Sequence, residues 1–230
     1  MKLPGPLHPA TFLSRPNRFL TEVELDGRVV EAHLPDPGRL RELLVPGARV
    51  WVRPEAGPNR KTGFTLTLVE KDGEKVSVVT TLPNQLTAEA LEAGRIQELV
   101  DWEVAAREHS WGRSRFDFLL ARGDERMLLE VKSVTLLDRR RALFPDAVTA
   151  RGARHVTELA AARAAGYDAA VLFVVQRRDA ESVTAARAID PAFADALIAA
   201  RGSGVRMLGY RCRVTLDEAA ITGPIPVAID

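Results

Sequence analysis

Three residues with side chains suited to hydrolytic chemistry lie in two neighbouring apolar runs of the chain. Asp117 lies in the first run, and Glu130 and Lys132 lie in the second. Because alternate residues of a strand share a face, Glu130 and Lys132 are expected to point to the same side. A polar turn around Gly123-Asp124 separates the runs, which predicts a hairpin that brings Asp117 near Glu130. The spacing therefore predicts a site with two carboxylates and one ammonium group.

Two carboxylates beside a lysine suit metal-assisted hydrolysis of a phosphodiester. Hard divalent cations such as Mg²⁺ or Mn²⁺ bind one or two carboxylates together with water and phosphate oxygens. Asp117 and Glu130 are the predicted metal ligands, and Lys132 is predicted to orient the attacking water and stabilise negative charge. The same short pattern also fits a solvent-facing Asp and an ordinary surface ion pair, so spacing alone leaves both interpretations open.

The composition indicates a globular protein with balanced charge. Its 230 residues are 46% hydrophobic, enough for one large core or two small ones. Lys and Arg number 32 against 31 Asp and Glu, so any basic surface for nucleic acid must be local. The single cysteine, Cys212, excludes an intramolecular disulfide and is expected to be a buried, inert thiol in a strand.

The sequence carries no signal for a membrane or for export. No apolar run approaches the ~20 residues of a membrane-spanning helix. The segment from Met1 to Phe12 also lacks a signal-peptide core. We expect a cytoplasmic protein without a membrane partner, and the sequence leaves open whether it forms a homo-oligomer.

Short strand patterns broken by turns fill residues 1–82. The turn signals are Asp26-Gly27, Asp72-Gly73 and the break Pro35-Asp36-Pro37-Gly38. The predicted strands are 19–25, 28–34, 48–53, 64–69 and 75–80. Five short strands are compatible with a closed OB-like barrel, a fold whose surface often binds oligonucleotides.

The pattern changes at residue 83, which predicts an all-β domain over 1–82 and an α/β domain over 83–230. Thr87 is expected to cap a helix that continues to Val100. The later predicted elements are a helix from about Val148 to Gly166, a buried strand over 169–176, a helix over 191–200 and a strand pair around 205–215. Helices on both sides of a mixed sheet would make this a three-layer α/β domain.

In this frame, Asp117 followed by Glu130-x-Lys132 resembles the PD-(D/E)xK nuclease-like superfamily. Longer blocks extend the resemblance to the sugar fermentation stimulation protein A family over nearly the full chain. The blocks are 15–19, 33–40, 83–91, 114–118, 130–136 and 144–152 with His155.

That resemblance implies an OB-like N-terminal domain, a nuclease-like C-terminal domain, DNA binding, and a link to the regulation of sugar utilisation. It assigns the metal positions to Asp117 and Glu130 and the catalytic lysine to Lys132, so the expected centre is a Mg²⁺- or Mn²⁺-dependent nuclease. The alternatives are a DNA-binding transcriptional regulator that keeps the scaffold without turnover, and an interaction module without nucleic-acid affinity. One departure is Asp36-Pro37-Gly38 where the family often has Asn-Thr-Gly, and the added negative charge is unfavourable for phosphate contact.

Other residues are candidates for completing the site in the C-terminal domain. The superfamily usually adds an acid from the first helix, and both Glu89 and Glu98 lie in predicted helical sequence, so the choice between them stays open. Arg151 and His155 are four residues apart and share a helix face, which predicts contacts to substrate. Arg151 near the helix start could bind phosphate with the free backbone N–H groups. A solvent-facing polar stripe is the alternative for all four residues.

A basic and aromatic surface is predicted in the N-terminal domain. Arg15, Arg18 and Arg39, together with Arg41 and the nearby Phe19, could hold backbone phosphates and stack on bases. The alternative is the solvated rim of a barrel.

Overall fold

The computed structural model describes residues 1–57 and 60–229, which divide into two compact units. The first unit comprises Met1–Leu82 together with Val214–Ala219, and the second comprises Pro83–Arg213 and the chain from Ala220 onward. Backbone hydrogen bonds to the first residues of the chain hold the inserted segment in the first unit. The Met1 amino group donates to the carbonyl of Ala219 at 2.7 Å, and the Leu3 N–H donates to Asp217 at 2.8 Å. A division drawn from local sequence patterns could not include such a distant segment.

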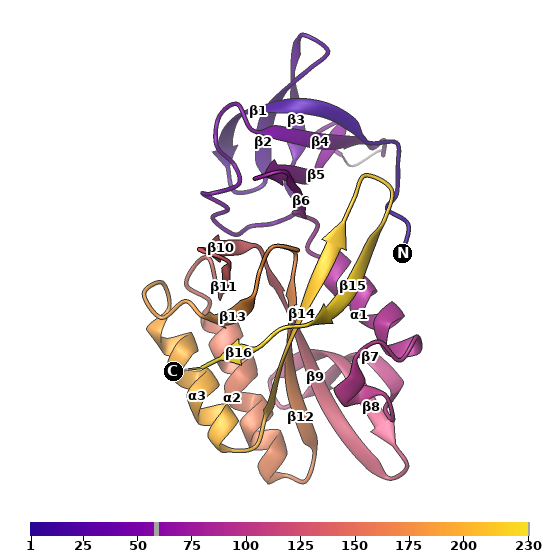
Figure 1. The fold of residues 1–230 in the computed structure, drawn as a ribbon, viewed down its shortest axis with the longest axis vertical. Coiled ribbons are helices and arrows are strands. Elements are labelled where there is room, and N and C mark those ends of the chain that lie inside the picture. Colours follow the sequence, from indigo (N-terminus) through magenta and orange to yellow (C-terminus); the bar gives the residue numbers. More distant parts are fainter. Residues whose placement is uncertain (58–59, 230) are drawn as a thin grey trace. The chain divides into compact units, whose positions relative to one another are not determined.

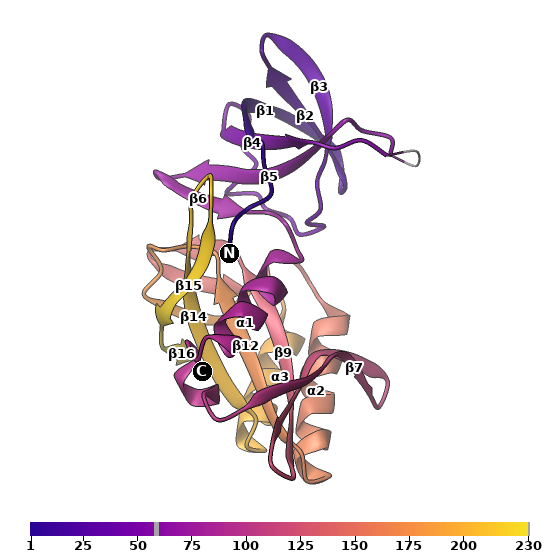
Figure 2. The same cartoon turned by 90° about the vertical axis from the view of Figure 1, so that its right-hand side faces the viewer.

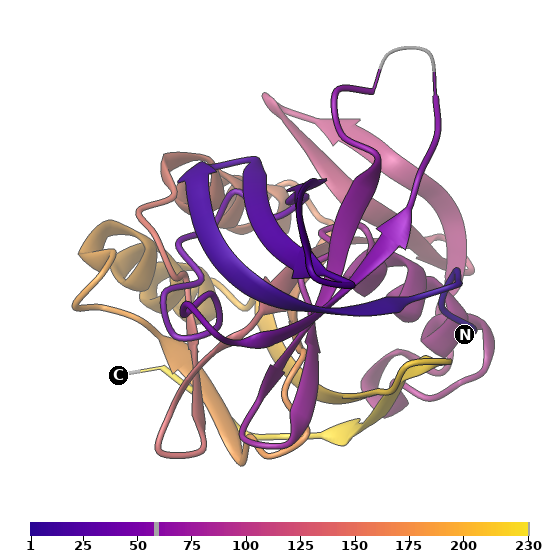
Figure 3. The same ribbon diagram turned by 90° about the horizontal axis from the view of Figure 1, so that it is seen from above.

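The first unit is a closed β-barrel with the OB-like architecture expected from its strands. Its strands are β1 (His8–Asn17), β2 (Leu20–Leu25), β3 (Arg28–His33), β4 (Arg49–Pro54), β5 (Phe64–Lys71) and β6 (Glu74–Ser77). The order is β3-β2-β1-β4-β5-β6, and a further parallel pairing between β3 and β5 closes the sheet. Figure 3 shows these strands curling around one another. Alternate side chains, including Phe12, Val23 and Leu66, fill the interior.

Strand β1 was not among the five predicted strands. It contains Pro9 and Pro16, and proline lacks the N–H that a strand inside a sheet would donate. In the barrel, Pro9 pairs with Trp51, and the pairing with β2 shifts register between Ser14 and Asn17. The barrel thus accommodates both prolines in a strand whose local sequence argues against one. The last predicted strand, 75–80, ends earlier, at Ser77.

The second unit is built on a six-stranded sheet with the order β15-β14-β12-β9-β8-β7. Its strands are β7 (Glu103–Trp111), β8 (Ser114–Arg122), β9 (Glu125–Val134), β12 (Asp168–Val175), β14 (Arg206–Val214) and β15 (Ala219–Pro224). A smaller sheet contains β10 (Leu136–Asp138), β11 (Arg141–Phe144), β13 (Ser182–Ala185) and β16 (Val227–Ala228). The helical elements are α1 (Leu82–Glu92), the 3₁₀ turn Gln97–Leu99, α2 (Ala150–Ala164) and α3 (Pro191–Gly202). Figure 1 labels these elements except the 3₁₀ turn.

Two successive crossovers place helices α2 and α3 on one face of the large sheet. Strand β12 pairs in parallel with both β9 and β14, so α2 and α3 each connect parallel neighbours. Right-handed crossovers that advance in one direction put their helices on the same side of a sheet. Figures 1 and 2 show α2 and α3 on that side and α1 on the other, as expected for a three-layer α/β unit. The core beneath α2 and α3 includes Val156, Phe173 and Phe193.

Several local predictions in the second unit are wrong. Thr87 is not a helix cap, because α1 begins at Leu82 with a proline in its first turn and buries Thr87 completely. The helix also ends at Glu92, not Val100. Residues 205–215 contain one strand, β14, whose neighbour is the later β15.

Strand β7 and the small sheet were missed as well. Strand β7 is an edge strand in which residues 107–110 are all polar, so its sequence lacks the apolar and polar alternation that predicts a strand. Within the described residues, no helix combines the length and hydropathy that a bilayer crossing requires.

Candidate active site

Asp117 lies where the two strands of the predicted hairpin separate. The antiparallel pairing of β8 with β9 runs from Arg122 with Glu125 to Phe118 with Leu129. One residue further, the Asp117 side chain replaces a backbone acceptor, because its Oδ2 accepts a hydrogen bond from the Val131 N–H at 2.7 Å. The Asp117 carboxylate therefore lies where β8 and β9 separate, next to the strand residue that follows Glu130.

The surroundings of Asp117 favour its protonated form more than water does. Burial, followed by the negative charge of Glu130, raises the pKa of Asp117 to about 6. Hydrogen bonds from the Val131 N–H and from Asn84 Nδ2, at 2.6 Å, oppose that rise. The negative charge of Glu130 on β9 thus acts on Asp117 on the neighbouring strand β8.

Glu130 is buried, and one of its oxygens binds two partners. Its Oε1 accepts a hydrogen bond from Lys132 Nζ at 2.6 Å and lies 2.7 Å from His155 Nδ1. Burial acts to raise the pKa of Glu130, but the hydrogen bond of His155 and the charge of Lys132 outweigh it and hold the pKa below its usual range. The other oxygen, Oε2, is buried and has no hydrogen-bond partner among the described residues.

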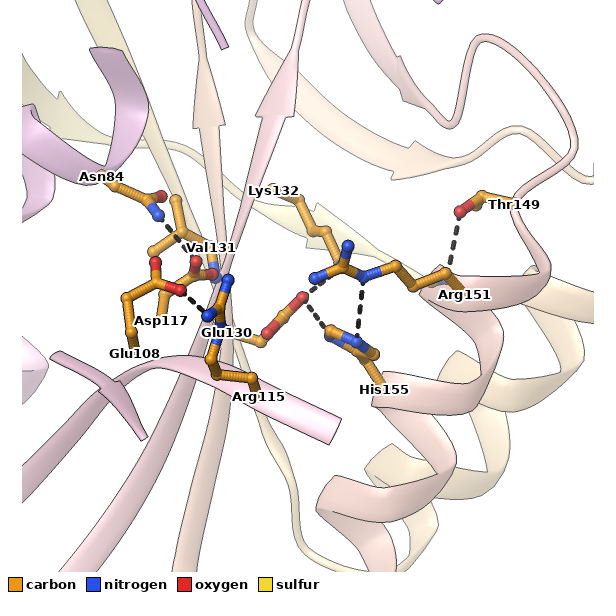
Figure 4. Close-up of polar contacts among 11 residues, drawn as sticks. Asn84, Glu108, Arg115, Asp117, Glu130, Val131, Lys132, Thr149, Arg151 and His155 are labelled. Carbon is orange, nitrogen blue, oxygen red and sulfur yellow. Dashed lines mark hydrogen bonds and ion pairs between the residues drawn. The ribbon is translucent and has the colours of Figure 1, made fainter. Parts of the chain in front are cut away.

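Helix α2 carries His155 and Arg151 to this cluster. Arg151 Nε donates to His155 Nε2 at 3.3 Å, so the two residues share a helix face as predicted and His155 links Arg151 to Glu130 (Figure 4). The helix start is held by its N-cap, Thr149, whose Oγ1 accepts from the Gly152 N–H at 3.0 Å.

A buried aspartate ties the starts of α2 and α3 together. Asp190 Oδ2 accepts from the Thr149 N–H at 2.7 Å, and its Oδ1 accepts from the Phe193 N–H at 3.0 Å as the N-cap of α3. Asp190 therefore fixes the position from which Arg151 and His155 project.

The side chains of Asp117 and Glu130 form hydrogen bonds with different sets of partners. Figure 4 shows Glu130 turned toward Lys132 and His155, and Asp117 turned toward Asn84 and Val131. Within residues 1–57 and 60–229, no three His, Cys, Asp or Glu side chains are arranged as a metal site. Even so, the buried Glu130 Oε2 and the raised pKa of Asp117 are the features expected where a cation would compensate buried negative charge.

The two candidate helix acids have other partners. Glu89 on α1 forms an exposed ion pair with Arg95. Glu98, in the 3₁₀ turn, accepts a hydrogen bond from the Tyr210 hydroxyl at 2.5 Å. Burial and that bond raise the pKa of Tyr210 to about 12. The α1 residue that reaches Asp117 is instead Asn84.

Sequence reasoning gave no role to Asn84. The residue lies in the block 83–91 that carries the family resemblance, directly after a helix-initiating proline. Its position in that block is the one signal that could have identified it.

The arginines predicted as substrate contacts in the first unit differ in their surroundings. The Arg15 guanidinium donates to the carbonyls of Gly38 at 2.7 Å and Arg39 at 2.9 Å, so it braces the 36–39 loop. In the same loop, Asp36 Oδ1 accepts a hydrogen bond from the Gly38 N–H. This turn consists of Asp36-Pro37-Gly38, the residues at which the sequence departs from the family pattern. Arg18 and the Arg39 side chain are exposed.

Family models match both units of the chain. Residues 13–78 match the model described as the SfsA N-terminal OB domain. Residues 81–218 match the model described as the Sugar fermentation stimulation protein RE domain. Together the two matches cover most of the chain.

Full-length relatives and a solved structure agree with those matches. The Sugar fermentation stimulation protein homolog of Moorella thermoacetica is 42% identical over 231 residues and 100% of both chains. The homolog of Methanothermobacter thermautotrophicus is also 42% identical, over 98% of this chain and 93% of its own. The structure of Pyrococcus furiosus SfsA in complex with Ca²⁺ superimposes with a TM-score of 0.91 at 28% identity, covering 100% of this chain and 98% of that one. This chain therefore belongs to the sugar fermentation stimulation protein family.

Proposed function

We propose that the chain binds DNA and hydrolyses phosphodiester bonds with a divalent cation, Mg²⁺ or Mn²⁺, held by Asp117 and Glu130. The observation that carries the proposal is the buried Glu130 Oε2, which has no partner in the described chain and lies next to a second acid whose pKa is raised. A bound cation supplies positive charge at the scissile phosphate and lowers the pKa of water. The Ca²⁺ complex of the Pyrococcus relative supports a divalent-cation site in this chain.

Each protein residue then has a separate task. Lys132, held by Glu130, orients the attacking water and stabilises charge that develops on the phosphate. His155 is a positioning residue, because it holds the Glu130 carboxylate from the opposite side. Arg151 lies at the start of α2, where its guanidinium and the positive end of the helix dipole favour a phosphate of the DNA backbone.

A DNA-binding regulator without turnover, linked to sugar utilisation, is the second candidate. It is favoured by the bonds that Lys132 and His155 make to Glu130 Oε1, because an oxygen with two partners has less capacity for a cation. It is also favoured by the different directions in which the two acids bond. This candidate predicts salt-sensitive DNA binding without cleavage.

The deciding experiment follows labelled single- and double-stranded DNA with Mg²⁺ or Mn²⁺, and compares the wild type with Asp117→Asn and Lys132→Gln. We expect both substitutions to abolish cleavage. Glu125→Gln is the matched control, because Glu125 is an exposed carboxylate of the same hairpin that pairs with Arg122. Equal products from all four proteins would indicate a contaminating nuclease and end the catalytic proposal.

Metal binding is measured separately by the electron paramagnetic resonance signal of free Mn²⁺. We expect wild type and Glu125→Gln to reduce this signal equally and Asp117→Asn to leave it unchanged. Metal binding without cleavage of any DNA would favour the regulator. No binding of Mn²⁺ by the wild type would contradict the metal site itself.

A further inference from the structure

A surface cavity of about 530 Å³ on the barrel of the first unit is built from three separate parts of the fold. Phe19 in the β1–β2 connection lies on one side, and Arg60 to Thr62 in the β4–β5 connection lie on another. Leu20 of β2 and His33 of β3 also line it. OB barrels bind oligonucleotides or oligosaccharides on the surface of their second and third strands, between these same two connections. The cavity therefore lies where this fold binds extended polymers.

An exposed aromatic ring faces this cavity on a fixed backbone. Phe19 is 46% exposed, although burying such a side chain would stabilise the barrel. Its N–H donates to Asn17 Oδ1 at 2.9 Å, and its carbonyl accepts from the Leu34 N–H at 2.9 Å. The ring stacks on His33, with 6.5 Å between ring centroids and 22° between planes. Such an ordered, exposed ring suits stacking against a planar ligand.

The charges around the ring favour an anionic ligand. The Arg18 guanidinium lies 5.6 Å from the Phe19 ring centroid, and Arg60 and Lys61 line the cavity. Two acids reduce this charge: Glu31 also lines the cavity, and Glu55 pairs with Arg60. Arg18 and Lys61 beside an aromatic ring match the alternating phosphates and bases of a single strand better than they match a neutral sugar chain.

We propose that this cavity binds single-stranded nucleic acid, with one base stacked on Phe19 and the adjacent phosphates near Arg18 and Lys61. Stacking on an aromatic ring is tolerant of sequence, because every base has a flat face. The site lies in a different unit from Glu130 and needs neither a metal ion nor cleavage. Its test can therefore fail or succeed independently of the proposed nuclease.

The test measures binding of a fluorescent oligo-dT of about 12 nucleotides, within the size range of one OB barrel, by anisotropy in EDTA. Oligo-rU of the same length distinguishes RNA from DNA, and maltohexaose tests the oligosaccharide alternative. We expect Phe19→Ala to weaken binding by about 5- to 150-fold, the effect of one lost base stack, and Phe19→Trp to restore it. Val29→Ala is the matched control, because Val29 is an apolar side chain of the same unit that is 66% exposed and does not line the cavity.

Two further measurements locate the contact. Lys61→Gln should reduce the slope of log affinity against log salt by about 0.7, the loss of one phosphate contact. Photocrosslinking of an oligonucleotide that contains 5-iodouracil should label Phe19 or His33. Equal affinities of Phe19→Ala and Val29→Ala, crosslinks confined to residues after Pro83, or binding of maltohexaose without either oligonucleotide would each overturn the proposal. If cleavage fails while these results hold, only the nuclease proposal is lost.

Discussion

His155 Nδ1 lies 2.7 Å from Glu130 Oε1, which joins helix α2 to the central strand β9 through two buried polar side chains. The two residues are 25 positions apart in the sequence. The Lys132 ammonium group donates a hydrogen bond to the same Glu130 oxygen, Oε1. A buried carboxylate is stabilised only if such partners replace its lost hydration. The cluster therefore contributes to both the fold and the proposed site.

We expect His155→Ala to lower the free energy of unfolding by about 2 kcal/mol or more, since it removes a buried hydrogen bond to a charged group. The hydrogen bond of His155 lowers the pKa of Glu130, so in the variant this pKa should rise. A carboxyl group whose pKa is lowered by folding stabilises the protein at neutral pH, and this stabilisation is lost as the pH falls through that pKa. In His155→Ala the pKa of Glu130 is less depressed, so the free energy of unfolding should decrease less on acidification. Urea unfolding from pH 4 to pH 8 measures both effects. Arg154→Ala, an exposed change on the same helix, is the control, and equal stability of the two variants would contradict the prediction.

Asp117 should have the opposite pH dependence. Its folded-state pKa of about 6 lies above the value of an unfolded chain, so its stabilising contribution is complete below about pH 3.9 and is lost as the pH rises through about 6. Asp117→Asn should therefore be about 1–3 kcal/mol more stable than the wild type at pH 8 and nearly equal near pH 4. Thermal unfolding across this range tests the prediction. A constant difference at every pH would show that Asp117 does not titrate as described.

A divalent cation should make the wild type more stable than Asp117→Asn at pH 8, the reverse of their order without the cation. Millimolar Mg²⁺ or Mn²⁺ should raise the unfolding temperature of the wild type at pH 8, because a ligand that binds only the folded state stabilises it. The same ions should leave Asp117→Asn unchanged and should act on Glu125→Gln as on the wild type. Equal shifts in all three proteins would indicate that the ions bind elsewhere.

Gly152→Ala should destabilise the start of α2. A Cβ atom at this position would lie 2.8 Å from both Cγ2 and Oγ1 of Thr149, so the capping side chain must rotate away. Loss of a helix cap costs about 0.5–2 kcal/mol. Gly202→Ala is the matched control, because nothing lies within 4 Å of its added Cβ and alanine favours a helix. Chemical denaturation of both variants measures the difference, and equal stabilities would argue against the cap.

Cys212 should resist thiol reagents in the folded protein. The side chain is completely buried, and burial raises the pKa of its thiol to about 12, so little thiolate forms at neutral pH. Ellman's reagent should therefore react at a measurable rate only after denaturant is added. Rapid reaction of the native protein at pH 8 would contradict the burial of strand β14.

Local sequence determined which side chains lie together within one strand, one hairpin or one helix. Alternation along β9 placed Glu130 and Lys132 together, the turn after β8 brought Asp117 beside them, and helical spacing aligned Arg151 with His155. These relationships follow from the repeat of a strand or a helix, so they could be predicted without knowing the fold.

Only the tertiary structure decided which distant residues meet. It brought Asn84 to Asp117 and His155 to Glu130, placed residues 214–219 in the first unit, and inserted the proline-containing β1 into the barrel. It also joined Phe19 and Lys61, from two separate connections, around one cavity. Such contacts form because packing and the need to satisfy buried polar groups outweigh local preference, and no short stretch of sequence contains that information.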